Sequence, residues 1–559
     1  MSFFRVFPKK TACLSGNFAA VSAWQTELEM KDGVLSFHAS PGTGGEALLF
    51  FGPLSASLYI DAAFQTRFPR PDLDKPYEIF FPDGVLFEPG TVFDAARLLE
   101  LLPARDDVML DQAQCALLQG EPKHALDLLL PLPDSEDKTN LLVRAVRQAF
   151  SLEKKQAMVD AIAGDRAAAL DRMATVPALY AHISAPKAAP QIAPHPTTQL
   201  PTDPPHVAII GDLSLPQCRH YRVEQKAEQL QSLGVKSSVF SRQELTAFEA
   251  ALPSFSHVIC YRLPLVPAVF SAIAATKAAG IPMLYETDDL LFDSVVFPGP
   301  KASYGADFSE DEYAELQVLP PLYLAAMALC DGVITSTSAL KSAISKALPG
   351  TPVHIHANAL GRQHRTAQEL ARGNTLKDTD IVELFYGTGT RALQSDFDDF
   401  AENCLAPLLK AQPGVRLTLM GYLDLPAVLT PFSGQIRHRP LGALGDYWQA
   451  LASADINLAP LEINHFNDCK SAIKWLEAAM FGVPTIASGT AGFLDAVTHS
   501  KTGMLCKNWE EWRAALTELV ENPSLREALG SAAKMAAEQH YSEDGAAQNI
   551  DHILAISKT

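Results

Sequence analysis

The chain has 559 residues, of which 48% are hydrophobic, and its formal net charge at pH 7 is −19. This length exceeds one ordinary domain, so we expect about three or four domains with sizeable cores. The acidic balance argues against general binding to nucleic acids or anionic membranes, and an anionic ligand would need a local basic cluster. No apolar run approaches the roughly 20 residues of a membrane span, and the N-terminus lacks a signal-peptide core. The eight cysteines show no metal-like spacing, which is typical of reduced thiols and predicts a cytoplasmic protein.

The first 205 residues divide into three stretches of different composition. Residues 1–92 contain short strand candidates separated by Gly, Pro and Asp turns, which predicts a small β-rich domain. Residues 93–183 change to a helical period, and 113–129 form a helix–glycine turn–helix pattern that resembles one tetratricopeptide-type (TPR-like) hairpin. This module has two alternative uses, helical packing and protein docking. The repeated prolines of 184–205 predict an extended linker.

Strands and helices alternate through the rest of the chain. Residues 206–361 open with the apolar strand His206–Gly211 and continue with further strands separated by helices. After a charged break the pattern restarts and fills residues 362–559. Such alternation predicts an α/β fold with parallel sheets covered by helices on both faces. Two Rossmann-like domains in succession place a ligand cleft between them, at the carboxyl ends of the strands.

The strongest functional pattern lies in residues 454–492. It reads as a strand, a polar loop, a helix carrying Lys470, Lys474 and Glu477, and a second short strand. Positions i, i+4 and i+7 share one helical face, so two ammonium groups and a carboxylate would point the same way. A helix N-terminus beside a strand end attracts anions, and a carboxylate further along accepts bonds from vicinal hydroxyls. The pattern therefore fits a nucleotide diphosphate, with a solvated helix face as the alternative for the lysines and an ion pair with Lys474 as the alternative for Glu477.

With these residues in view, the chain from 206 to 545 resembles the retaining "group 1" glycosyltransferases of GT-B fold, the class that includes glycogen and sucrose synthases, and a bacterial subgroup in particular. The motifs that carry the resemblance are Lys474-Trp475-Leu476-Glu477-Ala478-Ala479-x-x-Gly482-Val483-Pro484, Ala491-Gly492, Thr502-Gly503, Gly387-Thr388-Gly389-Thr390, Phe466-Asn467-x-x-Lys470-Ser471-x-x-Lys474 and Tyr285-Glu286-Thr287-Asp288-Asp289-Leu290-Leu291-Phe292. The resemblance does not extend to residues 1–205. Three positions depart from the family pattern: Cys469 stands where an acid is frequent, Tyr261-Arg262 where some members carry histidine, and Leu393-Gln394 where the subgroup has His-Asp. Glu462 or Asp468 is the candidate replacement for the acid at 469.

Glycosyl transfer breaks a sugar–phosphate bond, so fixed positive groups facing the leaving diphosphate supply most of the catalysis. The expected catalytic residues are Lys470, Lys474 and Arg391. The resemblance implies that the donor is bound by Glu477, Gly387, Thr388, Gly389, Thr390, Asn467 and Ser471. The acceptor side or cleft wall is expected to include Arg219, Arg222, Arg262, Asp288 and Asp289. Packing or solvent exposure is the alternative for the arginines, and a metal site is the less favoured alternative for the paired aspartates.

We therefore predict a hexosyltransferase-like enzyme that moves sugar from a nucleotide-sugar donor to a protein or cell-surface glycan acceptor, without a cofactor or a catalytic metal. Residues 206–361 would present the acceptor, residues 362–559 would bind the donor, and residues 1–183 would recruit the acceptor. Two alternatives from other classes stay open. One is a non-catalytic interaction protein with a degenerate GT-B half, and the other is a sugar-nucleotide epimerase or phosphorylase.

Overall fold

The computed structural model describes residues 106–180, 205–304, 307–371, 381–389, 394–440 and 442–555, together with short strands between Thr26 and Asp94. The chain divides into two compact units, Met1–Glu153 with Ala178–Pro186 and Lys154–Pro177 with Lys187–Thr559. In the described parts, no helix is long and apolar enough to cross a membrane. Residues 184–204 of the predicted linker lie outside the described residues, so the linker stays a prediction.

The described segments before residue 95 are short antiparallel strands. β1 pairs with β2 and β2 with β4, while β3 pairs with β7 and β5 with β6. Their bounds are β1 Thr26–Lys31, β2 Val34–Ala39, β3 Ser57–Leu58, β4 Phe64–Gln65, β5 Arg67–Pro69, β6 Pro76–Glu78 and β7 Phe93–Asp94. The segments between them lie outside the described residues. The small β-rich domain at 1–92 therefore stays a prediction.

The predicted helix–glycine–helix pattern forms at the expected place. α2 (Asp106–Gln119) is followed by Gly120 at φ +80°, and α3 (Pro122–Leu129) begins just beyond it. The left-handed backbone at this turn favours glycine, because other residues meet a steric penalty there. Ala116 and Ala125 are both buried, as expected where two helices approach closely. A TPR-like docking role for this hairpin stays a prediction.

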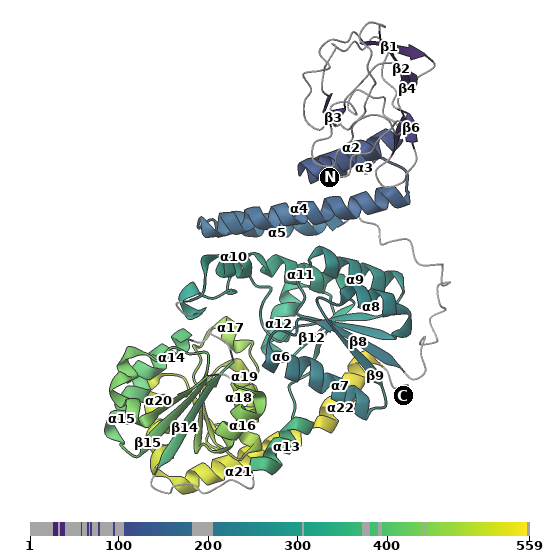
Figure 1. The fold of residues 1–559 in the computed structure, drawn as a ribbon. Helices are drawn as coiled ribbons and strands as arrows, with labels where there is room; N and C mark the ends of the chain where they lie inside the picture. Colours follow the sequence, from purple (N-terminus) through teal and green to yellow (C-terminus); the bar gives the residue numbers. More distant parts are fainter. Residues whose placement is uncertain are drawn as a thin grey trace. The chain divides into compact units, whose positions relative to one another are not determined.

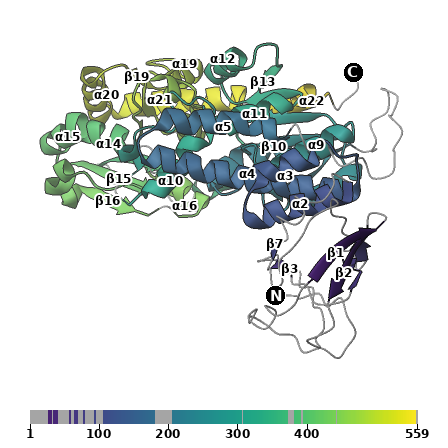
Figure 2. The same cartoon turned by 90° about the horizontal axis from the view of Figure 1, so that it is seen from above.

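Two longer helices follow, α4 (Glu136–Ile162) and α5 (Arg166–Tyr180). They lie side by side in both views (Figures 1 and 2), and Arg172 Nε on α5 lies 3.2 Å from Asp160 Oδ2 on α4. Residues Lys154–Pro177 of this pair belong to the same compact unit as the two α/β domains. The predicted helical module of residues 93–183 stays a prediction.

The first α/β domain is built on a six-stranded parallel sheet of order β13-β12-β11-β10-β8-β9. The strands are β8 His206–Gly211, β9 Lys236–Ser241, β10 His257–Tyr261, β11 Met283–Glu286, β12 Gly332–Thr335 and β13 Val353–Ile355. β10 and β12 are buried along their whole length. Helices lie on both faces of the sheet (Figure 1), which explains why these strands are continuously apolar rather than alternating.

The helices of the first domain connect these strands. They are α6 Pro216–Arg219, α7 Gln225–Ser232, α8 Leu245–Ala251, α9 Pro267–Ala278, α10 Glu310–Val318, α11 Pro320–Leu329 and α12 Ser338–Ala347, with short 3₁₀ turns at Leu252–Ser254 and Lys301–Tyr304. α13 (Arg362–Ala371) follows the last strand of this sheet and leads into the second domain. Between α6 and α7 the backbone forms a π-helical turn, His220–Glu224. Such turns interrupt α-helices rarely and are frequent at functional sites.

The second domain has a six-stranded parallel sheet of order β16-β15-β14-β17-β18-β19. Its strands are β14 Val382–Thr388, β15 Val415–Gly421, β16 Ile436–Arg439, β17 Ile456–Ala459, β18 Thr485–Ser488 and β19 Met504–Cys506. Its helices are α14 Gln394–Phe400, α15 Ala406–Ala411, α16 Leu444–Ala452, α17 His465–Asp468, α18 Ile473–Met480, α19 Ala491–Ala496, α20 Trp509–Glu521 and α21 Pro523–His540, with a π-helical turn at Ala401–Leu405 and 3₁₀ turns at Ala427–Gln435. This order of strands is that of a Rossmann fold, so the predicted pair of Rossmann-like domains is confirmed.

The last helix returns to the first domain. α22 (Glu543–Leu554) follows α21 of the second domain, but Ile550 and Leu554 pack in one buried cluster with Val207 and Ile209 of β8. The chain therefore crosses between the two domains twice, and the second crossing ties them together at a point far from the first in sequence.

Candidate functional site

A cavity of about 1090 Å³ lies at the carboxyl ends of the strands of both sheets. In each sheet the strand order reverses direction around the first strand, β8 in one and β14 in the other. Asp212 after β8 and Arg262 after β10 line the cavity from the first domain, and Gly389 after β14 and Glu462 after β17 line it from the second. Because ligands of doubly wound sheets bind at such reversals, this cavity is the candidate site.

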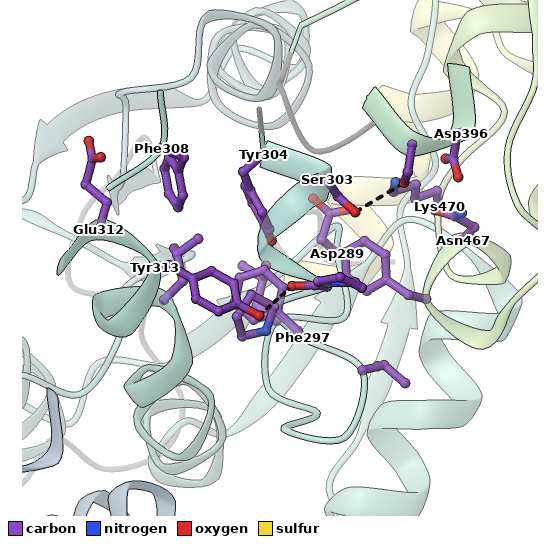
Figure 3. A pocket seen from close by; sticks show the side chains of 18 of the residues that line it. Asp289, Phe297, Ser303, Tyr304, Phe308, Glu312, Tyr313, Asp396, Asn467 and Lys470 are labelled. Carbon is purple, nitrogen blue, oxygen red and sulfur yellow. Dashed lines mark hydrogen bonds between the residues drawn. The ribbon is translucent and has the colours of Figure 1, made fainter. Parts of the chain in front are cut away.

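Among the described residues, Lys470 is the cationic side chain that the second domain contributes to this cavity. It lines the wall beside Asn467 and Asp396, as Figure 3 shows. Its Nζ lies 4.9 Å from the centre of the Phe466 ring. Burial lowers the pKa of Lys470, while the carboxylates of Asp289 and Asp396 oppose that shift. A partly desolvated ammonium group at a cavity wall is well suited to bind an anionic ligand.

The backbone around Lys470 is held from several sides. Thr337 Oγ1 donates to the carbonyl of Cys469 (2.9 Å), and Asn358 Nδ2 donates to Ser471 Oγ (3.0 Å). A Cβ atom at Gly492 would overlap the Lys470 carbonyl oxygen, so only glycine allows this approach. Both hydrogen bonds come from the first domain. The position of Lys470 therefore depends on contacts between the two domains.

The expectation that one helix carries Lys470, Lys474 and Glu477 is wrong for Lys470. α17 ends at Asp468 and α18 begins at Ile473, so Lys470 lies in the connection between them. In a continuous helix the Cys469 carbonyl would accept from a backbone N–H four residues further on, but here it accepts from Thr337 Oγ1. Lys474 and Glu477 do lie on α18, as predicted.

The acid expected near position 469 has two candidates with different environments. Cys469 itself is buried, and burial raises the pKa of its thiol to about 12, so it is neutral. Asp468 Oδ1 accepts from the backbone N–H of Ala491 (2.9 Å) at the start of α19. Glu462 lines the cavity. Of the two acids, Glu462 is therefore the one in reach of a ligand there.

Lys474 does not line the cavity. Its Nζ is buried without a hydrogen-bond partner among the described residues and lies 4.4 Å from the centre of the Tyr386 ring. Burial, followed by the nearby charge of Lys470, lowers the pKa of Lys474 from 10.5 to about 8. Burying the charged ammonium group of Lys474 near the cavity costs desolvation free energy on folding.

We predict that the Lys474→Met substitution stabilises the protein at pH 7. Between about pH 8 and 10.5 the unfolded chain binds more protons at this position than the folded chain, so the free energy of unfolding rises with pH through that window. Removing the ammonium group should raise the free energy of unfolding by about 1–3 kcal/mol at pH 7. This gain is the desolvation cost that is removed, reduced by the cation–π attraction to Tyr386 that is lost. The gain should shrink as the pH approaches 10.5.

Urea unfolding of wild type and variant at pH 7 and pH 10 measures this difference. Lys410→Met on α15 is the matched control, because Lys410 is exposed and its ammonium group keeps its contact with water in the folded protein. An equal difference between Lys474→Met and wild type at both pH values would contradict the prediction.

Glu477 also lies outside the cavity lining. Its side chain is 1% exposed, and Oε1 accepts from the hydroxyl of Tyr221 (2.7 Å) and from Trp448 Nε1 (3.2 Å). Desolvation raises the pKa of Glu477, and the hydrogen bonds from Tyr221, Trp448 and Tyr447 oppose that rise. A ribose-binding role for this carboxylate stays a prediction, since its Oε1 is already bonded across the two domains.

A histidine completes this buried network. Gly361 N–H donates to His364 Nδ1 (2.9 Å), so His364 Nε2 carries the proton and donates to the Tyr221 oxygen (2.9 Å). Burial lowers the pKa of His364 to about 3, which keeps it neutral. The network is a chain of donors that ends on Glu477 and joins the two domains.

Arg262 and its two aspartates form the first-domain side of the cavity. Arg262 has a left-handed backbone (φ +51°), and its guanidinium pairs with Asp288 (2.5 Å) and with Asp289. Tyr261 Oη donates to Asp288 Oδ1 (3.0 Å). Burial raises the pKa of Asp289, and the charges of Arg262 and Lys470 oppose the rise. Arg262 and Asp289 both line the cavity, as expected for cleft residues.

The two other predicted arginines lie elsewhere. Arg222 is fully buried in the first domain, where its Nε donates to Glu286 Oε1 (2.7 Å). Its Nη1 donates to Asn358 Oδ1 (2.9 Å), which connects it to the Ser471 contact. Arg219 is exposed and pairs with Glu224 (2.7 Å). Neither lines the cavity, because the π-helical turn directs Arg222 into the protein interior.

The remaining predicted donor residues fall into three groups. Gly389 and Asn467 line the cavity. Gly387 and Thr388 end β14, and a Cβ at Gly387 would overlap the Tyr447 ring. Thr390 and Arg391 lie outside the described residues, so their roles stay predictions.

The sequence reasoning missed the aromatic side of the cavity. Phe297, Tyr304, Phe308 and Tyr313 line it, and all come from the long connection between β11 and β12. This connection does not follow the strand–helix alternation. Its high density of aromatic residues is the sequence signal that could have indicated a cavity wall. Arg166 on α5 also lines the cavity, and no local pattern could have indicated it.

Residues 382–522, from β14 to just beyond α20, match the family model described as "Glycosyl transferases group 1". No curated protein matches the sequence. Among solved structures, a sucrose-phosphate synthase from Thermosynechococcus elongatus is 14% identical over 63% of this chain and 98% of its own, with a TM-score of 0.45. The HepE protein of Anabaena, in complex with UDP and glucose, is 14% identical over 62% and 99% with a TM-score of 0.44. A glycosyltransferase from Rickettsia africae is 11% identical over 64% and 99% with a TM-score of 0.46. The segment that matches the family model thus carries Lys470, Lys474 and Glu477.

Proposed function

We propose that this chain is a glycosyltransferase that uses a nucleotide-sugar donor. The observation that carries the proposal is the position of Lys470, inside a segment that matches the group 1 glycosyltransferase model and on the wall of a cavity formed by both Rossmann-like domains. The cavity volume of about 1090 Å³ is at the upper end of ordinary ligand sites, enough for a donor and part of an acceptor.

In the proposed reaction, an acceptor hydroxyl oxygen bonds to the anomeric carbon of the donor sugar. The bond from that carbon to the phosphate oxygen breaks, and its electron pair leaves on the diphosphate, which also takes up the hydroxyl proton. Lys470 would face the charge that develops on the leaving diphosphate, with Lys474 behind it and Arg262 on the opposite wall. Charges already in place at that point stabilise the transition state without reorganisation.

Further parts of the proposal rest on the sequence resemblance. We infer a retaining, bacterial-type hexosyltransferase that acts in the cytoplasm without a cofactor and without a catalytic metal, and an acceptor that is a glycan or a protein. The first α/β domain would present the acceptor and the second would hold the donor. Residues 1–183 would recruit the acceptor.

Nucleotide-sugar binding by the full-length protein tests this function. We expect at least one of UDP-glucose, UDP-N-acetylglucosamine, ADP-glucose, GDP-mannose and dTDP-rhamnose to raise the melting temperature, because a ligand of the folded state stabilises it by about 2.7 kcal/mol at a concentration of 100 Kd. Calorimetry then gives the dissociation constant. Absence of binding by every donor would reject the proposal.

One observation favours a second candidate function, a non-catalytic interaction protein. Cys469 occupies a position where the family often has an acid, and its thiol is buried and neutral. A protein of this kind would bind no nucleotide sugar, or would bind one without transferring or hydrolysing it. The same calorimetry, followed by product analysis, separates the two functions.

A further inference from the structure

One wall of the cavity is apolar and aromatic. It is formed by the connection between β11 and β12, and its lining includes Val295, Phe297, Tyr304, Phe308 and Tyr313. Figure 3 shows Tyr304, Phe308 and Tyr313 at one end and Lys470 with Asp396 at the other. Val295 is 85% exposed and lines the cavity. We call residues 294–299 with Tyr304, Phe308 and Tyr313 the aromatic wall.

The aromatic wall is held by a residue from outside both α/β domains. Arg166, the first residue of α5, donates through Nη2 to the carbonyl oxygens of Ser294 and Phe297, each at 2.7 Å. Tyr313 Oη donates to the carbonyl of Gly299 (2.9 Å). One guanidinium thus fixes both ends of the segment 294–297. Charge-assisted hydrogen bonds are stronger than neutral ones, so Arg166 contributes much of the order of this loop.

The charges near the aromatic wall indicate what it accepts. Asp212, Asp307 and Glu312 also line the cavity. The Arg166 guanidinium also lines the cavity, but its Nη2 donates to the backbone carbonyls of Ser294 and Phe297. An anionic acceptor would be repelled here, whereas carboxylates accept hydrogen bonds from hydroxyl groups and flat aromatic faces pack on the C–H faces of a sugar ring.

We propose that Arg166 is a positioning residue for an acceptor wall that takes an uncharged saccharide. The binding of an acceptor by this wall rests on the proposed function. The aromatic wall, the hydrogen bonds from Arg166 and the charged residues of the lining are properties of the structure itself. It gives the α4–α5 helical pair a part in substrate selection. Arg166 itself need not touch the sugar, since its effect passes through the carbonyls of Ser294 and Phe297.

Kinetics of the full-length protein with the Arg166→Ala substitution tests the positioning role. We expect the acceptor KM to rise about 10-fold or more, because two charge-assisted hydrogen bonds to the wall are lost. The donor Kd from calorimetry should stay within about twofold, because Arg166 donates to the carbonyls of Ser294 and Phe297 and not to Lys470. Arg166→Lys should recover part of the acceptor affinity, because an ammonium group still donates to carbonyls.

Lys154→Ala is the matched control. Lys154 lies on α4 of the same helical pair and forms an ion pair with Glu315 (2.5 Å), but it does not line the cavity. It should leave the acceptor KM unchanged. Equal effects of Arg166→Ala and Lys154→Ala on the acceptor KM, or a parallel loss of donor affinity in Arg166→Ala, would overturn the positioning role.

Saccharide binding without donor tests the acceptor class independently. Maltotriose, cellotriose and chitotriose serve as uncharged probes and trigalacturonate as the acidic comparator, with binding followed by tryptophan and tyrosine fluorescence. We expect at least one uncharged trisaccharide to bind, Phe308→Ala to weaken it and trigalacturonate to bind more weakly. Tighter binding of trigalacturonate, or no binding of any uncharged probe, would overturn the class. If the protein binds uncharged saccharides but no nucleotide sugar, the proposed function is refuted, but saccharide binding by the aromatic wall is retained.

Discussion

Lys470→Ala is expected to lower kcat/KM for sugar transfer by about 10²–10³-fold, the loss typical of removing one group that stabilises developing charge. Lys470 is the lysine on the cavity wall among the described residues, and burial has already stripped part of its hydration. Its charge therefore acts on a bound diphosphate with little screening. The donor should also bind more weakly, because part of the interaction exists before the transition state.

Lys410→Ala is the control for this substitution, since Lys410 lies exposed on α15 of the same domain. Steady-state kinetics gives the activities, and circular dichroism with a melting curve shows whether the fold is kept. Activity of Lys470→Ala within about threefold of wild type, with the fold intact, would remove Lys470 from the mechanism.

Lys470 is a sharper target than the two other residues of its motif. Glu477→Ala would leave the buried donors of Tyr221 and Trp448 without an acceptor, so a loss of activity could follow from a loss of structure. Lys474→Met is expected to change stability as well as activity, because its ammonium group is desolvated. Burial lowers the pKa of Lys470 as well, so its substitution is interpreted together with the melting curve, but Lys470 lines the cavity and the two other residues do not.

Gly492→Ala is expected to reduce transfer by about 10²-fold, although the residue touches no ligand. Its added Cβ would overlap the carbonyl oxygen of Lys470, so the backbone of Lys470 or α19 must move. Movement of this segment also strains the hydrogen bonds from Thr337 and Asn358. Overpacking of this kind costs typically about 1–3 kcal/mol of stability, so the melting temperature should fall as well.

Gly445→Ala is the matched control for the glycine. Gly445 lies in α16 of the same domain, and a Cβ there meets no heavy atom within 4 Å. It should leave activity unchanged and stabilise slightly, by about 0.5–1 kcal/mol, because alanine is the better helix former. Full activity of Gly492→Ala at normal donor affinity would show that the exact position of the Lys470 backbone is unimportant. If Gly492→Ala does not fold, we expect Gly492→Ser to fail to fold for the same steric reason. Thr337→Ala then tests the same segment, because it removes the hydrogen bond from the first domain to the Cys469 carbonyl.

Local patterns predicted the architecture of the α/β half because they depend only on neighbours in sequence. Apolar strands of four to seven residues, such as His206–Gly211 and Val382–Thr388, separated by helices, are sufficient to predict parallel sheets. The same reasoning placed Gly389, Asn467 and Lys470 near strand carboxyl ends, and all three line the cavity. In the N-terminal half, the turn at Gly120 was predicted for the same reason, since a glycine between two helical periods is a local signal.

Contacts between distant residues decided the rest. Lys470 lies between α17 and α18, where Thr337 and Asn358 form hydrogen bonds with its neighbours. Arg222 is buried in the first domain, where it donates to Glu286. The aromatic wall and its clamp by Arg166 join segments more than 100 residues apart, at a sequence separation of 128 for the Ser294 contact.

The sequence by itself therefore determined the two sheets, the order of their elements and the motif that carries Lys470 on the cavity wall. Tertiary structure alone decided that Lys474 and Glu477 are buried behind this motif, and that α22 returns to the first domain through Ile550. The physical reason is that periodicity and turn chemistry act within a few residues, whereas burial and charge pairing depend on which segments meet after folding.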